Sequence, residues 1–154
     1  MSSSELMGAA LEQAALGLEA GEVPIGSVVV AGGEVVARSH WRPRDGLLAH
    51  PELVALQEAN RRDVTLVTTL EPCLLCMAAA MFQFAERIVY ALESPTDGGT
   101  RIRDLWDPAA GSVAPYRFPA VEPAVRRDES AQLVRDFLER FPGSTFASWA
   151  QTLV

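Results

Sequence analysis

Short apolar runs alternate along the chain with longer amphipathic stretches, a pattern typical of strands and helices that take turns. Gly32-Gly33 separates the first two runs as a hairpin turn would, and the first run is rich in β-branched residues such as Val28 and Val29. The predicted strands cover residues 26–31, 34–39, 64–70, 88–92 and 121–125. We therefore expect a five-stranded sheet that begins with a hairpin.

The amphipathic stretches predict helices on both sides of that sheet. Ser4 is the expected N-cap of the first helix and Gly21 closes it. The predicted helices cover residues 4–18, 51–60, 73–86, 130–141 and 146–154, with a short one near 102–106 inside an irregular segment at 95–119. Strands that alternate with helices favour a three-layer α/β/α architecture, with a mixed sheet that is parallel after the first hairpin.

Length and composition favour a single domain over residues 1–154. Hydrophobic residues make up 49% of the chain, but no apolar run approaches the roughly 20 residues of a membrane span. The N-terminus lacks a basic segment followed by an apolar core, so a cytoplasmic location is expected. The net charge of -7 disfavours a nucleic-acid partner, because such proteins usually carry a basic face.

Three soft side chains have the pattern of a metal site. Cys73 and Cys76, the only cysteines, are three positions apart at a predicted helix start, and His50 precedes another helix. Zinc favours thiolate and imidazole ligands, and a catalytic zinc site has three protein ligands with a fourth position left for water. A structural site needs a fourth ligand, yet the only other histidine is His40. Glu52 is too close to His50 to join the same ligand set and can face the water instead.

Taken singly, each motif also has ordinary explanations. A histidine at a helix start is commonly a cap or a packed surface residue. A lone C-x-x-C can be a redox pair, half of a structural zinc site or two buried thiols. Together the motifs favour one catalytic zinc per chain, held by His50, Cys73 and Cys76.

The two motifs, in this order, resemble one known family. H-x-E at residues 50–52 followed by P-C-x-x-C at 72–76 is the signature of zinc deaminases. Residues 22–30 and 78–81 are also similar to the cytidine deaminase superfamily, in particular its tRNA adenosine deaminase and guanine deaminase branch. The resemblance covers about residues 5–93.

The resemblance implies a cytidine deaminase-like fold, a homodimer, and a hydrolase that removes an exocyclic amine as ammonia. Zinc then activates water for attack on the amine-bearing carbon. Glu52 takes the proton of that water and passes protons to the ring nitrogen and the leaving amine.

Some positions depart from the family pattern. A small residue with a free N–H usually stands between the His and the Glu, whereas Pro51 has none; it is either a good first helical residue or a lost substrate contact. Trp41 stands where tRNA adenosine deaminases carry Asn, and it either stacks on a ring or covers the core edge. Glu93 or Asp97 can accept a hydrogen bond from the leaving amine, or be a solvated loop acid.

The segment after Arg140 has no basic residue, unlike the basic C-terminal helix of the tRNA enzymes. We therefore predict deamination of a free nucleobase, a nucleoside or a related aminated heterocycle, with Glu52 as the catalytic residue. The first alternative is a tRNA-specific adenosine deaminase; a catalytically inactive zinc scaffold and a redox protein are alternatives from other classes. The expected substrate contacts are Trp41, Pro51, Glu93 and Asp97.

Overall fold

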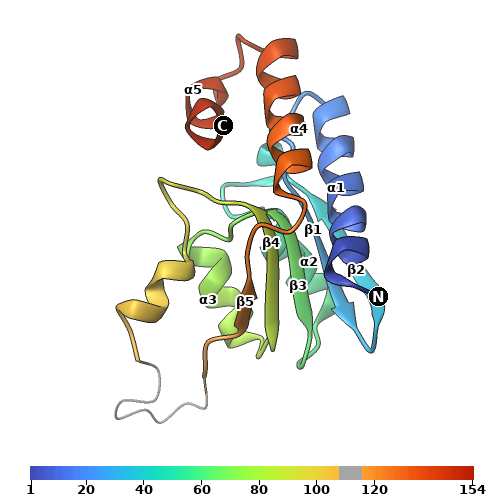
Figure 1. Cartoon of the computed structure of the whole chain (residues 1–154), viewed down its shortest axis with the longest axis vertical. Helices are drawn as coiled ribbons and strands as arrows, with labels where there is room; N and C mark the ends of the chain where they lie inside the picture. The colour runs from blue at the N-terminus through green and yellow to red at the C-terminus, as the bar shows by residue number, and fades with distance from the viewer. Residues whose placement is uncertain (108–115) are drawn as a thin grey trace.

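The computed structural model describes residues 1–107 and 116–154. Within these residues five strands form one sheet in the order β2-β1-β3-β4-β5 (Figure 1). β1 pairs antiparallel with β2 and β3, whereas β3, β4 and β5 run parallel to one another. The strands are β1 (Gly26–Ala31), β2 (Glu34–His40), β3 (Thr65–Leu70), β4 (Arg87–Leu92) and β5 (Ala120–Glu122). The predicted mixed sheet, parallel after the hairpin, is confirmed.

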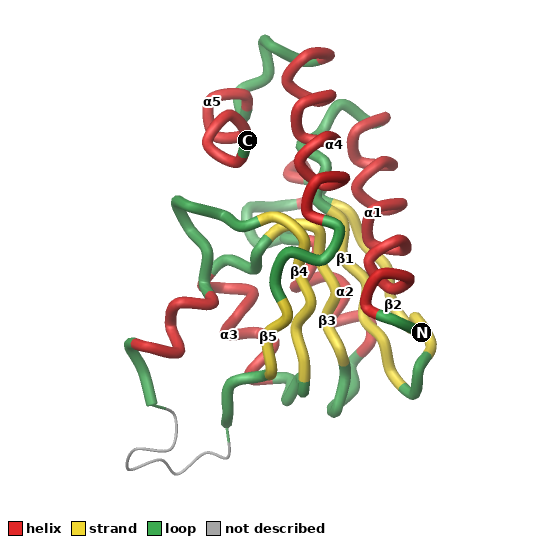
Figure 2. Tube along the Cα trace, in the orientation of Figure 1, coloured by secondary structure: helices red, strands yellow, loops and turns green. Residues whose placement is uncertain are grey.

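Helices cover both faces of the sheet and complete three layers (Figure 2). α1 (Ser3–Glu19) and α4 (Arg127–Arg140) lie on one face, and α2 (Pro51–Ala59) and α3 (Leu74–Phe82) on the other. The strand side chains alternate between these layers, so that Val28 packs with the α1 side and Val29 with the α2 and α3 side. The three-layer α/β/α prediction is confirmed. No helix in the described ranges is long and apolar enough to cross a lipid bilayer.

α1 approaches β1 very closely at one position. A Cβ added to Gly26 would lie 2.2 Å from the carbonyl oxygen of Ala10, so only glycine allows this contact. The chain ends in a short helix, α5 (Ala147–Ala150), followed by a 3-10 turn at Gln151–Leu153. This C-terminal segment packs with Leu70 and Leu92, at the carboxyl ends of β3 and β4. The last residues of the chain therefore reach the edge of the sheet where α3 begins.

Several element boundaries differ from the prediction. Ser2, not Ser4, caps α1, because Ser2 and Glu5 form a reciprocal capping box with a 2.6 Å bond from the Ser2 N–H to Glu5 Oε2. α3 starts one residue after Cys73 and ends at Phe82 instead of continuing to residue 86. Phe84 adopts a φ of +58°, which a right-handed helix cannot contain.

The same kind of backbone turn moves the last predicted elements. β5 stops at Glu122 instead of residue 125, because Ala124 has a φ of +61°. Arg126 has a φ of +54° and is the N-cap of α4. The helix thus starts directly after Arg126, before the predicted residue 130. The short helix expected near 102–106 is a 3-10 helix at Thr100–Asp104. Residues 108–115 of the predicted irregular segment lie outside the described residues.

Candidate active site

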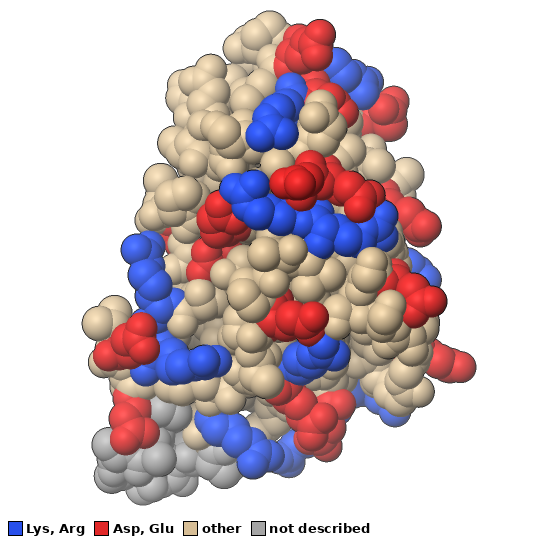
Figure 3. Space-filling model, in the orientation of Figure 1, with Lys and Arg blue, Asp and Glu red and all other residues tan. Residues whose placement is uncertain are grey.

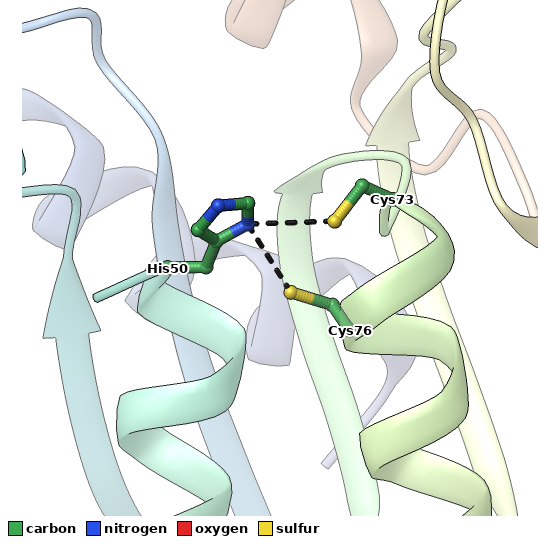
Figure 4. A group of neighbouring side chains, drawn as sticks. All are labelled: His50, Cys73 and Cys76. Atoms are coloured by element: carbon green, nitrogen blue, oxygen red, sulfur yellow. Dashed lines mark hydrogen bonds between the residues drawn. The ribbon is translucent and has the colours of Figure 1, made fainter. Parts of the chain in front are cut away.

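Two helix starts meet at the carboxyl edge of the sheet and bring three soft ligands together. His50 is the N-cap of α2, Cys73 is the N-cap of α3, and Cys76 lies in the first turn of α3 (Figure 4). Nδ1 of His50 is 3.4 Å from Sγ of Cys73 and 3.5 Å from Sγ of Cys76. All three ligand atoms lie within 4.8 Å of one another. The structure thus assembles the predicted ligand set.

The chemistry of these donors fits zinc. Two sulfurs and one imidazole nitrogen are typical zinc ligands, and three protein ligands leave one coordination position for a reactant. Contact with Cys76 and with the nearby His50 holds the pKa of the Cys73 thiol at about 4. The pKa of Cys76 is raised by the same contact and by burial. A bound cation favours both thiolates, as does the partial positive charge of the α3 N-terminus.

Glu52 lies in the first turn of α2, beside the three ligands and with 4% of its surface exposed. Its Oε1 accepts a hydrogen bond from the Thr68 hydroxyl at 3.2 Å, and its Oε2 accepts one from the Cys76 thiol, with Sγ at 3.4 Å. Burial raises the pKa of the Glu52 carboxyl to about 7. A carboxyl group that titrates near neutral pH can both accept and return a proton under ordinary conditions.

A cavity of about 260 Å³ opens beside His50, Glu52 and Cys73. Its other lining residues are Ile25, Trp41, Pro51, Leu70, Glu71, Asp97, Phe146 and Trp149. Three of these form what we call the aromatic wall: Trp41, Phe146 and Trp149. The ring centroid of Trp41 is 4.7 Å from that of Phe146 and 6.2 Å from that of Trp149, both in edge-to-face geometry. The cavity therefore joins a metal-ligand set to an aromatic surface.

The predicted substrate contacts divide into two groups. Trp41, Pro51 and Asp97 line the cavity, and Trp41 also packs against the core, whereas its stacking on a ring stays a prediction. Glu93 is not among the lining residues, and its carboxylate forms a two-pronged ion pair with Arg127 at the start of α4, with Nε and Oε2 at 2.8 Å. The structure therefore does not place Glu93 at the cavity. A substrate contact by Glu93 stays a prediction.

Glu71 lines the cavity but is not among the predicted site residues. It is 8% exposed and accepts hydrogen bonds from the Ser94 N–H, at 3.0 Å, and from the Thr100 hydroxyl. A Cβ at Gly98 would lie only 2.3 Å from Glu71 Oε2, so the segment passes directly over this carboxylate. Glu71 thereby anchors the segment that carries Asp97. An acidic residue directly after an apolar strand was the available signal.

Phe146 and Trp149 were likewise not predicted as site residues. Their apolar spacing near the C-terminus indicated a helix. The spacing did not indicate which part of the molecule this helix would pack against. Only the packing of the C-terminal segment over β3 and β4 brings them beside Trp41.

Comparison with known proteins agrees with this geometry. The model of the "Cytidine and deoxycytidylate deaminase zinc-binding region" matches residues 1–92, which include all three ligands and Glu52. The chain belongs to this family. The paired motifs predicted this family, and its zinc-binding region coincides with the group of three side chains that could hold a metal ion.

Relatives in this family include enzymes of tRNA. The chain is 32% identical over 145 residues to a tRNA-specific adenosine deaminase of Agrobacterium fabrum, which covers 87% of this chain and 92% of that protein. It is also 37% identical over 141 residues to a tRNA(Ile)-lysidine synthase of Deinococcus deserti and 40% identical to that of Deinococcus radiodurans. The chain spans only about a quarter of the length of these two synthases, 26% and 23%.

Solved structures give the same picture. A tRNA deaminase from work on adenosine-to-inosine editing at the wobble position is 32% identical, with a TM-score of 0.73 and coverage of 84% of this chain and 98% of that one. A protein crystallised with 8-azaguanine shares the fold with a TM-score of 0.74 at 23% identity, covering 90% of this chain and 85% of that one. The predicted cytidine deaminase-like fold is confirmed.

The prediction that a nucleic acid is an unlikely partner is wrong. Relatives that act on tRNA match almost the whole chain. The prediction rested on the net charge of -7 and on the neutral segment after Arg140, but a sum over the chain does not describe local charge. Figure 3 shows arginine and acidic side chains interleaved across one face, so cationic side chains are available there.

Proposed function

We propose that this protein hydrolyses the exocyclic amine of an adenosine in tRNA and releases ammonia and inosine. The observation that carries the proposal is the likeness to tRNA-specific adenosine deaminases over nearly the full length of both chains. The cavity supports it, because a pocket of about 260 Å³ beside the ligand set can admit a single base turned out of its stack.

The residues of the site have distinct roles in this proposal. His50, Cys73 and Cys76 hold zinc, which when bound supplies the Lewis acidity that makes water a nucleophile near neutral pH. Glu52 accepts a proton from water as the oxygen adds to the amine-bearing carbon. It returns this proton to the ring nitrogen, then takes the remaining proton of the added hydroxyl and delivers it to the amino group, so that the C–N bond breaks and ammonia leaves. Trp41 and the rest of the aromatic wall stack on the ring, and Asp97 accepts a hydrogen bond from the leaving amine.

The test uses the purified, zinc-loaded protein and an anticodon stem-loop RNA with adenosine at the first anticodon position. We expect inosine at that position, together with RNA binding that weakens as salt concentration rises. The matched control carries guanosine at the same position and should release no ammonia. A protein that leaves the adenosine unchanged contradicts the proposal.

The aromatic wall favours a second candidate, a free aminated heterocycle. By the resemblance in sequence Trp41 stands where tRNA adenosine deaminases carry Asn, and its edge-to-face packing against Phe146 and Trp149 encloses one side of the cavity. Such a wall suits a small planar ring. Ammonia release from a panel of aminated purines, pyrimidines and triazines distinguishes this candidate from the first.

A homodimer is part of the proposal. Leu74 and Phe82 are 57% and 59% exposed on α3, and with Ala78 between them they share one helix face at i, i+4 and i+8 spacing. A second copy that covers this face removes large apolar side chains from water. Analytical ultracentrifugation should give twice the chain mass, and a Leu74→Glu variant should shift it towards the monomer.

The predicted single domain and cytoplasmic location also belong to the proposal. Both the N-terminal helix and the C-terminal segment pack against the same sheet, which supports one domain. An enzyme of tRNA with two free thiols at its metal site suits a reducing compartment. Limited proteolysis that yields one stable core, and localisation of a tagged chain in cells, test these two points.

A further inference from the structure

Two buried hydroxyl groups lie directly beneath Glu52. Ser27 on β1 and Thr68 on β3 are register partners, and neither has any exposed surface. The Ser27 hydroxyl donates to Oγ1 of Thr68 at 2.9 Å, and the Thr68 hydroxyl donates to Oε1 of Glu52 at 3.2 Å. A continuous chain of donors therefore runs from the middle of the sheet to the carboxylate.

These hydroxyls occupy the face of the sheet that packs against α2 and α3. The neighbouring positions on this face are the apolar residues Val29 and Leu66, which are fully buried. A hydroxyl group in such surroundings is costly unless it is hydrogen-bonded. Here each hydroxyl donates its hydrogen to the next group in the series. The last acceptor is a carboxylate, which can only accept hydrogen bonds when it is ionised. Hydrogen bonds aligned in this way strengthen one another.

The chain of donors also distinguishes the two oxygens of Glu52. Oε1 is engaged by Thr68, whereas Oε2 is turned towards the ligand set and lies 3.4 Å from Sγ of Cys76. Glu52 itself lines the cavity, but neither Ser27 nor Thr68 does. Any effect of the two hydroxyls on the reaction must therefore pass through the carboxylate.

We propose that Thr68, supported by Ser27, is a positioning residue that holds Glu52 by one carboxylate oxygen and so presents the other to the reactants. This inference rests on the proposed role of Glu52 as the proton carrier. It goes beyond that role because it assigns the orientation of the carboxylate to two residues of the sheet that touch neither metal ligands nor substrate.

The variants that test it separate the hydroxyl from the shape of the side chain. Thr68→Val removes the donor to Glu52 at nearly constant shape and leaves the Ser27 hydroxyl without an acceptor. The double variant Ser27→Ala with Thr68→Val replaces the pair by two apolar side chains. Thr68→Ser keeps the donor, and Ser27→Ala keeps the bond from Thr68 to Glu52. Both kcat and the unfolding temperature are measured for each variant, at equal zinc content.

We expect kcat to fall about 10- to 100-fold in Thr68→Val and equally in the double variant, with little change in KM, as when a supporting partner of a site residue is removed. The unfolding temperature should fall in Thr68→Val and recover in the double variant, which buries no unpaired hydroxyl. Thr68→Ser and Ser27→Ala should stay within a few-fold of the wild-type kcat. A purely structural role predicts instead that kcat recovers together with stability, and that result would overturn the proposal.

Thr69→Val is the matched control. Thr69 is the next residue on β3, equally buried, and its hydroxyl accepts the Gly26 N–H at 3.0 Å, away from Glu52. This variant should lower the unfolding temperature without the loss of kcat. An equal loss of kcat in Thr69→Val would show that the effect is general to β3.

A second measurement needs no turnover. In the zinc-free protein, Thr68→Val should lower the unfolding temperature more when Glu52 is present than in a Glu52→Ala background. Only when Glu52 is present does the substitution remove the hydrogen bond between residues 68 and 52. Equal shifts in the two backgrounds would rule out the coupling. This cycle also separates the two proposals: wild-type activity retained by Glu52→Ala refutes the role of Glu52, whereas absent coupling refutes only the positioning by Thr68.

Discussion

The ligand set and the aromatic wall both border one cavity, and they are built in different ways. The ligands and Glu52 stand at the starts of α2 and α3, where short motifs fix their spacing within a single helical turn. The aromatic wall joins Trp41, just after β2, to Phe146 and Trp149 near the C-terminus. The proposed chemistry is therefore encoded locally, whereas the proposed substrate surface depends on packing between distant segments. Changes on the two sides should have separable effects.

The largest effect is expected when the ligand set is removed. Cys73→Ser combined with Cys76→Ser leaves one good zinc ligand of three, so we expect loss of zinc and of all measurable turnover. Elemental analysis and ammonia release measure the two losses. Chelation of the wild-type protein should reproduce the loss of turnover, and added zinc should reverse it. Stoichiometric zinc in the double variant would contradict the ligand assignment.

Glu52→Ala should retain zinc and lose turnover by about 10²–10⁴-fold, the usual range for a proton carrier. The residue lies beside the ligands but outside the three-ligand group, so zinc content should not change. Glu58→Ala, on the exposed side of the same helix, is the control and should behave as wild type. Near-normal ammonia release by Glu52→Ala would reject the assigned role.

Trp41→Ala tests the aromatic wall without touching the ligands. Stacking of a base on an aromatic side chain is worth ~1–3 kcal/mol, which corresponds to roughly a 5- to 150-fold loss of kcat/KM. Zinc content should stay at one per chain. Trp106→Ala removes a tryptophan that lies outside the cavity and should leave kcat/KM unchanged. If Trp41→Ala instead releases zinc, the two sides of the cavity are not separable.

The smallest effect is expected at Pro51, which lines the cavity and starts α2. Pro51→Ala restores a backbone N–H, and one hydrogen bond contributes about 0.5–1.5 kcal/mol net. We expect a shifted preference among ring substrates, in favour of those with an acceptor facing residue 51, and no change in zinc. The ratios of kcat/KM across several aminated rings measure this shift. Unchanged ratios would mean that Pro51 serves only as a first helical residue.

The sequence by itself determined the elements and the reactive groups. The β-branched runs and the hairpin glycines predicted the sheet, and the spacing of His50, Glu52, Cys73 and Cys76 predicted the site, because ligands at helix starts are placed by local geometry. Element ends were less predictable where residues such as Phe84 and Arg126 take positive φ values, because the sequence pattern did not indicate them.

Tertiary structure alone decided what surrounds those groups. It placed Phe146 and Trp149 beside Trp41, turned Glu93 towards Arg127, and buried Ser27 and Thr68 beneath Glu52. These contacts join positions far apart in the chain, and their energy comes from burial and hydrogen bonds that exist only after the layers have packed. The net charge led to the wrong prediction about a nucleic-acid partner for the same reason, because a sum over the chain contains no information on where each charge lies.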